Sequence, residues 1–242
     1  MMTIALFVTA CSAEQSNPKP TLNDPYTLPD LIQFNFRWSA EPDIDLFGSP
    51  ESAIRAYHES YYIASFAHST AAGYPGYEKA TKELVFDPRR VRDINDRTNY
   101  SGRPRVGTAY AHLMSINETE RGLRALICEG NYSLMIASSD GTFNNYGTRI
   151  PTAIFIYLEP GPKGTAPTQP LQEGPGRAPQ TDMFGGWTIT RHEFSTRNFD
   201  DDLACENKFP DSPESRPTRV NDNLTSPYPT LPPYPGWPES SP

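Results

Sequence analysis

The sequence is poor in the residues that build zinc sites. It has three cysteines and four histidines, and no two cysteines are spaced as Cys-x-x-Cys. Structural zinc sites use cysteine and histidine ligands at close, regular spacing. The acidic run Asp200–Asp202 lacks the spacing of a calcium-binding EF-hand loop, and a solvated acidic loop is the simpler interpretation. We therefore expect no metal site and no cofactor.

Basic residues are outnumbered, and long apolar runs are missing. The chain has 21 Lys and Arg against 29 Asp and Glu, which gives a net charge of −8. Nucleic acids and anionic lipid head groups attract basic surfaces, so this balance argues against both as electrostatic partners. No apolar stretch reaches the roughly 20 residues that a membrane-spanning helix needs.

A nucleophile motif is missing as well. The sequence has no Gly-x-Ser-x-Gly elbow. Ser, His and Asp occur along the chain, but a catalytic triad is defined by geometry rather than by composition. These absences favour a protein that is not an enzyme.

The N-terminus, in contrast, carries a signal. Residues 1–10 form an apolar run that ends in small residues before Cys11, as the hydrophobic region of a secretory signal peptide does. The stretch Val8–Cys11 resembles a bacterial lipobox, which implies removal of residues 1–10 and acylation of Cys11. No Lys or Arg precedes Lys19, which departs from the usual basic start of such signals. The alternative is a buried N-terminal strand with an ordinary core cysteine.

Acylation of Cys11 predicts a protein that its lipid holds at the extracytoplasmic face of the cell membrane. Cys128 and Cys205 then remain as a pair. An oxidising compartment permits a disulfide between them. The alternative is two unrelated buried thiols, because sequence alone does not place two cysteines within bonding distance.

Proline content divides the chain into three parts after the signal. Residues 11–27 are polar and punctuated by proline, which predicts a flexible tether. Residues 28–205 are long enough for one hydrophobic core. In residues 206–242 the prolines are too dense for a helix or a central strand, so we expect a disordered or polyproline II tail. Tyr228, Tyr234 and Trp237 also suit a docking peptide for an aromatic groove, although a solvated tail is the simpler interpretation.

One helix is clearly marked. Ser49 suits the N-cap, Pro50 the first helical position, and Glu51 the positive end of the helix dipole. Apolar residues then follow at helical spacing on one face: Ile54, Tyr57, Tyr61 and Ala64. We expect that face to cover a sheet.

The chain after residue 105 is patterned as strands. The candidate strands are 106–116, 123–128 with its continuation 131–137, 152–160 and 186–194. An interior glycine at Gly130 predicts a bulge. The predicted fold class is α+β, with an N-terminal helix packed on a curved antiparallel sheet of four or five strands, and with disordered tails on both sides.

This order of elements, a helix after Ser49 and then strands that close with Gly186-Trp187-x-Ile189, resembles the NTF2-like or cystatin-like fold of small exported proteins. That fold is common among actinobacterial envelope lipoproteins. The resemblance implies a pocket between helix and sheet, in which enzymes of this fold place an acid or base beside a tyrosine. The residues available for such a pocket are Tyr57, Tyr61, His112 and His192. Against this role, tyrosines at helical spacing usually pack in a core, and histidines on alternating strands usually face solvent.

The sequence thus favours a lipid-anchored envelope protein that acts as a non-enzymatic binding or interaction module. Its expected partners are the membrane, through the lipid, and an envelope protein or a small ligand. Two alternatives stay open. One is a small pocket enzyme of the NTF2-like type, and the other is a prophage-type lipoprotein that excludes superinfecting phage.

Overall fold

The structure is a computed structural model that describes residues 25–86, 102–145, 147–161, 172–195, 199–217 and 223–239. The predicted signal peptide, Cys11 and the predicted tether up to residue 24 lie outside the described residues. Within the described ranges, no helix is both long enough and apolar enough to cross a membrane.

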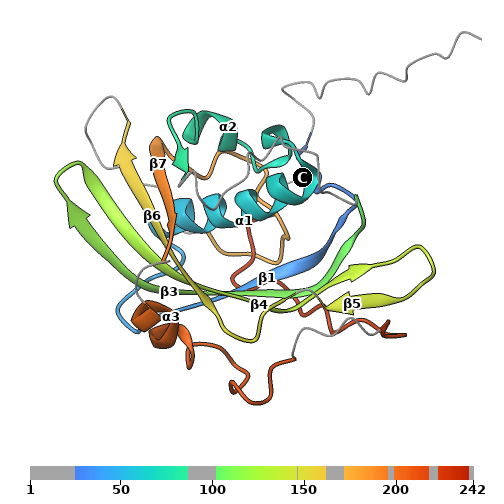
Figure 1. Cartoon of the computed structure of the whole chain (residues 1–242). Coiled ribbons are helices and arrows are strands. Elements are labelled where there is room, and N and C mark those ends of the chain that lie inside the picture. The colour runs from blue at the N-terminus through green and yellow to red at the C-terminus, as the bar shows by residue number, and fades with distance from the viewer. Residues whose placement is uncertain are drawn as a thin grey trace, which may run out of the picture.

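One mixed β-sheet organises the described chain (Figure 1). Its seven strands are β1 (Ile32–Ala40), β2 (Val85–Phe86), β3 (Arg105–Thr119), β4 (Gly122–Ala137), β5 (Phe143–Asn145), β6 (Thr152–Pro160) and β7 (Trp187–Phe194). The order across the sheet is β1-β3-β4-β6-β7-β2, and β5 pairs with β4. The α+β class is confirmed. The expectation of an antiparallel sheet of four or five strands is wrong, because the described residues form seven strands, and β1 is parallel to β3 and β2 to β7.

The first described element is a strand, whereas we expected a helix. In β1, Phe34, Phe36 and Trp38 alternate with polar residues and are buried, which is the period of a strand with one face in a core. Because β1 and β3 are parallel neighbours, the chain must cross one face of the sheet between them. That crossover carries the helix α1 (Glu51–Ala67).

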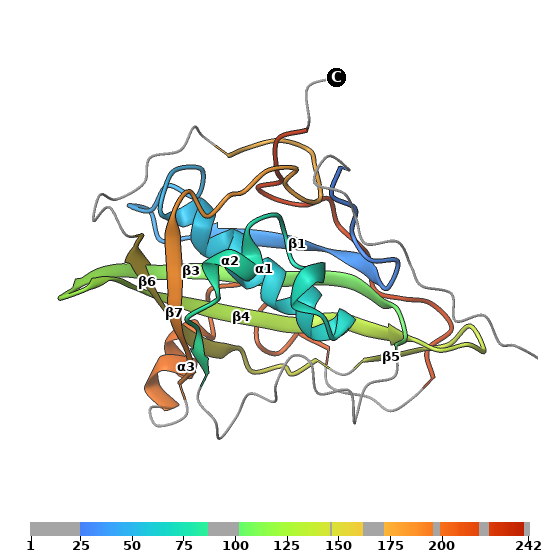
Figure 2. The same cartoon turned by 90° about the horizontal axis from the view of Figure 1, so that it is seen from above.

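Helix α1 lies along one face of the sheet, together with the short helices η1 (Thr70–Ala72) and α2 (Tyr77–Ala80) (Figures 1 and 2). The predicted apolar positions Ile54, Tyr57 and Ala64 are fully buried in the main core cluster. The opposite side of α1 is also largely buried. A helix that is buried nearly all round needs cover on both sides, and later parts of the chain supply it.

The start of α1 differs by one residue from the prediction. Pro50 occupies the N-cap position, and no side chain caps the helix. Ser49 instead accepts a hydrogen bond at Oγ from the indole Nε1 of Trp187, at 3.2 Å. The hydroxyl that suits a cap therefore joins the helix start to β7.

The predicted bulge near Gly130 is confirmed. Tyr110 of β3 pairs with Gly130 of β4, and Thr108 pairs with Ser133. Two residues of β4 therefore oppose one residue of β3, which defines a β-bulge.

The other face of the sheet is covered by α3 (Phe199–Cys205) and the residues that follow it (Figure 1). The predicted disulfide is present: Cys128 of β4 is bonded to Cys205 at the end of α3, with an S–S distance of 2.04 Å. The acidic run is not a solvated loop as expected. Asp202 Oδ1 accepts a hydrogen bond from the Ala153 amide at 2.7 Å, and Asp201 Oδ2 accepts one from Ser195 Oγ at 2.8 Å.

The expectation of a disordered tail over 206–242 is wrong for its described residues. The segment Pro229–Trp237, which we call the strap, runs beside β1 and ends with Trp237 only 1 % exposed in the main core cluster. The prolines do exclude regular secondary structure from this segment. Its order comes from hydrogen bonds to the domain and from one deeply inserted side chain.

Candidate functional site

Tyr57 and His192 form the most enclosed acid–base contact among the predicted site residues. Tyr57 projects from α1 and His192 from β7, and the tyrosine hydroxyl shares a hydrogen bond with His192 Nδ1 at 2.7 Å. Both side chains are fully buried. Burial lowers the pKa of His192 to about 3 and raises the pKa of Tyr57 well above its usual value, so both groups are neutral in the folded protein.

A shift in strand pairing turns His192 toward the helix. Leu158 of β6 pairs with Ile189, whereas the preceding Tyr157 pairs with Arg191. The extra residue in β7, Thr190, reverses the alternation, so that Arg191 is exposed and His192 is buried. We expected this histidine to face solvent because uninterrupted alternation would place it there.

Tyr61 extends the same cluster. Its ring centroid lies 4.6 Å from that of His192, and it stacks on Tyr57 at 6.3 Å. His58, on the same helix, is buried against Trp38 with a centroid distance of 5.2 Å. Burial lowers the pKa of His58 to about 3. The helix thus presents aromatic and imidazole rings, all uncharged, to the sheet.

Glu129 belongs to this region but was not among the predicted site residues. It lies on β4, opposite Ala111 of β3 and Thr152 of β6. The Tyr62 hydroxyl of α1 donates a hydrogen bond to its carboxylate. Burial raises the pKa of Glu129 to about 7, yet the side chain keeps some accessible surface. The sequence showed it only as the residue before the bulge at Gly130.

His112 is not part of this cluster, because it points to the opposite face of the sheet. Its Nδ1 shares a hydrogen bond with Ser39 Oγ at 2.8 Å, and its Nε2 lies 3.2 Å from Glu41 Oε1. The same carboxylate accepts a hydrogen bond from Lys208. Of the four predicted candidates, the structure brings together Tyr57, Tyr61 and His192 and separates His112.

A second buried polar group lies on the other side of α1. The carboxylate of Glu59 is 2 % exposed and accepts three hydrogen bonds, from Trp38 Nε1 at 2.8 Å, Tyr74 Oη at 2.7 Å and Trp237 Nε1 at 2.8 Å. Burial raises the pKa of Glu59, against the opposing effects of nearby Arg55 and of these donors. Sequence reasoning missed this group because its partners come from distant parts of the chain.

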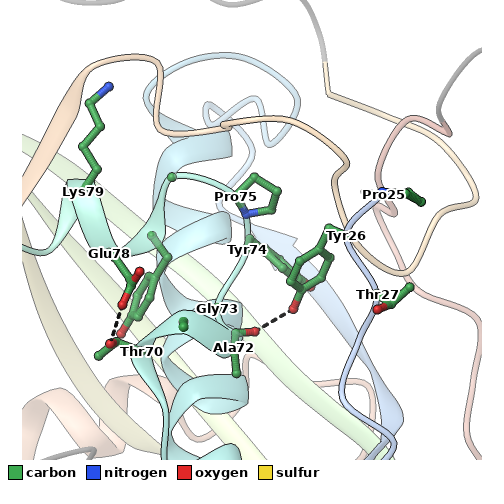
Figure 3. A pocket seen from close by; sticks show the side chains of 13 residues that line it. Pro25, Tyr26, Thr27, Thr70, Ala72, Gly73, Tyr74, Pro75, Glu78 and Lys79 are labelled. Atoms are coloured by element: carbon green, nitrogen blue, oxygen red, sulfur yellow. Dashed lines mark hydrogen bonds between the residues drawn. The ribbon is translucent and has the colours of Figure 1, made fainter. Parts of the chain in front are cut away.

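A surface cleft of about 660 Å³ opens beside the start of the described chain (Figure 3). It is lined by residues 25–27 and 70–79. Tyr26 forms one wall, where its hydroxyl donates a 2.7 Å hydrogen bond to the Ala72 carbonyl oxygen and its ring meets Tyr74 edge to face at 5.5 Å. Thr70 and Glu78 are hydrogen-bonded to each other in the opposite wall (Figure 3).

A neighbouring cleft of about 600 Å³ shares Tyr26 and Thr27 with the first. Its other lining residues are Leu28, Gly176, Arg177, Ala178, Gln180 and, directly after the strap, Pro238 and Glu239. Tyr26 therefore stands between two hollows. Together they form a surface of mixed polarity, and aromatic rings beside a few polar groups are a common lining of ligand sites.

Among the described residues, no group of three or more His, Cys, Asp or Glu side chains is arranged to hold a metal ion. No protein-family model, curated protein or solved structure matches this chain. The resemblances to a lipobox and to the NTF2-like fold therefore stay predictions.

Proposed function

We propose that this protein is a lipid-anchored envelope protein that binds a ligand, without catalysis, at the two clefts beside Tyr26. The observation that carries this proposal is the pair of adjoining clefts, of about 660 and 600 Å³. Their size is that of ordinary ligand pockets. The ligand class is an envelope protein segment or a small molecule.

The disulfide supports the extracytoplasmic location. Disulfides persist in oxidising compartments and are rare where thiols are kept reduced. The bond between Cys128 and Cys205 joins β4 to the segment that covers the face opposite α1. Its presence agrees with export of the domain, which the predicted lipobox at Cys11 also requires.

The position of the clefts fits a membrane-proximal ligand. Pro25 lines the larger cleft and lies 25 − 11 = 14 residues after Cys11. A fully extended chain of that length reaches at most about 50 Å. An anchor at Cys11 would therefore keep the clefts within about 50 Å of the bilayer surface, where envelope proteins and lipid-linked molecules gather.

The anchor is tested by the intact mass of the protein from the membrane fraction. Loss of residues 1–10 with an added acyl mass, and absence of both changes in a Cys11→Ala control, would support the anchor. An unprocessed and soluble chain would contradict it.

The clefts are tested by photo-crosslinking in native membranes, which captures a ligand of any chemical class. A photoreactive residue replaces Thr27, which lines both clefts. The matched control replaces Ile150, which is 54 % exposed and lines neither cleft. A discrete adduct at Thr27 alone supports the proposal, and equal labelling at both positions contradicts it.

A second candidate function, a pocket enzyme, is favoured by one observation. Tyr57 and His192 are in hydrogen-bond contact between α1 and β7, and Glu129 lies under the same helix with a pKa raised by burial to about 7. An acid and a base with such different pKa values suit general acid–base chemistry. This candidate requires a pocket between the helix and the sheet, as the NTF2-like resemblance implies.

The enzyme candidate requires that small molecules reach His192. Treatment of the native protein with diethyl pyrocarbonate, followed by mass mapping, measures this access. Modification of His192 at a rate comparable with that of the partly exposed His68 would support a pocket. Modification of His192 only after unfolding would exclude it as a catalytic base.

A further inference from the structure

The strap is attached to the domain largely through main-chain atoms. The Tyr234 amide donates to the Phe36 carbonyl at 3.1 Å, and the Trp38 amide donates to the Tyr234 carbonyl at 2.5 Å. The Trp237 amide and carbonyl both pair with Gly176, each at 2.9 Å. A peptide that pairs with its host through the backbone in this way resembles a bound ligand more than a packed core element.

Side chains of β1 and β3 complete this attachment by donating hydrogen bonds to the carbonyl groups of the strap. Asn35 Nδ2 donates to the Leu231 carbonyl at 2.9 Å, and Arg37 Nη1 donates to the Pro232 carbonyl at 2.7 Å. Thr108 Oγ1 donates to the Pro229 carbonyl at 2.8 Å. Prolines lack an amide hydrogen, so a proline-rich segment is recognised mainly through such carbonyl contacts.

The large side chains of the strap are exposed, apart from Trp237. Leu231 is 38 % exposed and Tyr234 is 48 % exposed. A terminal segment that served only to complete the core would bury these apolar groups. The strap instead buries its end, residues 235–237, and leaves Leu231 and Tyr234 at the surface.

The anchor enters a polar pocket. The indole Nε1 of Trp237 donates to Glu59 Oε2 at 2.8 Å, and the guanidinium of Arg55 lies over the indole ring, 4.3 Å from its centroid. Arg55 Nη2 also donates to the carbonyls of Pro235 and Gly236, at 2.7 and 3.2 Å. The pocket thus recognises the indole ring of Trp237, its N–H donor, and the carbonyl groups of the two residues before it.

The domain holds this pocket together without the strap. Glu59 keeps two of its three donors, Trp38 and Tyr74. Arg55 keeps its Nη1 bonds to the carbonyls of Leu46 and Gln172, at 3.0 and 3.1 Å. Pre-organisation of this kind lowers the cost of binding a peptide.

A glycine contact adds selectivity. A Cβ atom at Gly236 would lie 2.2 Å from the Gly174 carbonyl oxygen, and a Cβ at Gly174 would lie 2.3 Å from the Trp237 carbonyl oxygen. Both contacts are with main-chain atoms, which cannot rotate away. Only glycine before the anchor lets the two backbones approach so closely.

From these contacts we propose that the groove formed by β1, α1 and Gly174–Gly176 is a recognition site for proline-rich peptides that contain Pro-Gly-Trp, and that the strap is its resident ligand. A partner protein that presents such a peptide would compete with the strap for the groove. The groove shares Gly176 and Tyr74 with the walls of the Tyr26 clefts. The two proposals still fail separately, because the groove is tested by peptide binding at the indole pocket and the clefts by crosslinking at Thr27.

The test uses the full chain with Trp237→Ala, which empties the indole pocket, and a fluorescent synthetic peptide of residues 229–239. We expect saturable binding at least about tenfold tighter than to the wild-type chain, measured by fluorescence anisotropy. Peptides with Trp237→Phe, which lacks the N–H donor, or Gly236→Ala should each bind about tenfold more weakly or worse. A Leu231→Ala peptide is the matched control and should bind as the unchanged peptide does. Equal binding of all four peptides would overturn the proposal.

Hydrogen exchange of the wild-type chain keeps the proposal testable if the Trp237→Ala variant does not fold. If the strap is a resident ligand, it detaches from the groove while the rest of the domain stays folded. The amides of Trp38, Tyr234 and Trp237 should then exchange faster than those paired between β3 and β4. Exchange of all these amides only with global unfolding would identify the strap as an integral part of the fold and would overturn the proposal.

Discussion

The two faces of the sheet are closed by different chemistry. On the face that carries α1, the cover contains charged and titratable groups: Arg55, His58 and Glu59 are buried, and His192 rises from the sheet beneath them. On the face that carries α3, the cover is bonded covalently through Cys128 and Cys205. The first face therefore depends on which protons and partners are present, and the second combines the disulfide with a buried Arg216 that lies over Tyr132. A single domain thus combines one face with buried titratable groups and a second face, the stapled face, that is held by a disulfide.

The largest expected effect is on the α1 face, at Glu59. Glu59→Leu leaves the indole N–H groups of Trp38 and Trp237 without their acceptor, leaves Tyr74 only the Arg177 carbonyl, and removes the carboxylate beside Arg55. We expect the free energy of unfolding to fall by about 3–5 kcal/mol, because a buried charge loses its compensation. Urea denaturation measures this change. Glu59→Gln, which keeps one oxygen acceptor, should lose clearly less, and a Glu59→Leu variant as stable as wild type would refute the role of the network.

The next effect is on the stapled face. The disulfide closes a loop with a sequence separation of 77 residues, so its loss in a Cys128→Ser, Cys205→Ser double variant should reduce the free energy of unfolding by about 2–4 kcal/mol. A reducing agent should bring the wild-type protein to the same stability and leave the double variant unchanged. If reduction destabilises the double variant too, the effect does not come from this bond.

The pH dependence should come from the α1 face and have two opposing parts. Burial lowers the pKa of His58 and His192 from 6.5 to about 3, so between these values the unfolded chain binds more protons, and stability falls as the pH drops. Burial raises the pKa of Glu129 from 4.5 to about 7, so the folded chain binds more protons in that window, and stability is lost as the pH rises through 7.

Because two histidines oppose one glutamate, stability should rise from acidic pH and level off near about pH 7. Urea midpoints measured from acidic to mildly alkaline pH give the profile. Glu129→Gln should make the rise in stability between about pH 5 and 7 steeper and keep the acidic decline. A flat profile in the wild-type protein would show that the α1 face is not titrating as proposed.

The smallest effect is expected for the ion pairs beside His112. Glu41 lies 3.2 Å from His112 and also accepts a hydrogen bond from Lys208, and its own side chain is 33 % exposed. Pairs in contact with solvent contribute little, so Glu41→Gln should change the free energy of unfolding by less than about 1 kcal/mol. A larger loss would mean that this face, too, depends on charge.

Local patterns in the sequence predicted the elements whose signals are themselves local. Pro50, Glu51 and the apolar spacing indicate helix α1, and alternation and turn residues indicate strands β3, β4, β6 and β7. The alternation of Phe34, Phe36 and Trp38 carries the same kind of signal for β1, although β1 was not among the predicted strands. The parallel pairing of β1 with β3 has no local signal, because it depends on a crossover through α1.

The candidate site was harder to predict, for two physical reasons. His192 faces inward only because of the extra residue in β7, and a one-residue shift reverses every later side chain. Trp237 was assigned to a tail because proline density excludes helices and strands, but it does not exclude a fixed extended chain. Glu129 became visible as a site residue only when folding placed α1 above it.

The strap has a consequence for solubility as well. Strand β1 ends the sheet on one side, and exposed edges of this kind are templates for aggregation. Tyr234 pairs with this edge beside Arg37, and it is flanked by Pro233 and Pro235, which have no amide hydrogen to offer to another strand. The strap therefore adds one pairing to the edge strand β1. Its flanking prolines offer no amide hydrogen with which a further strand could pair at that position.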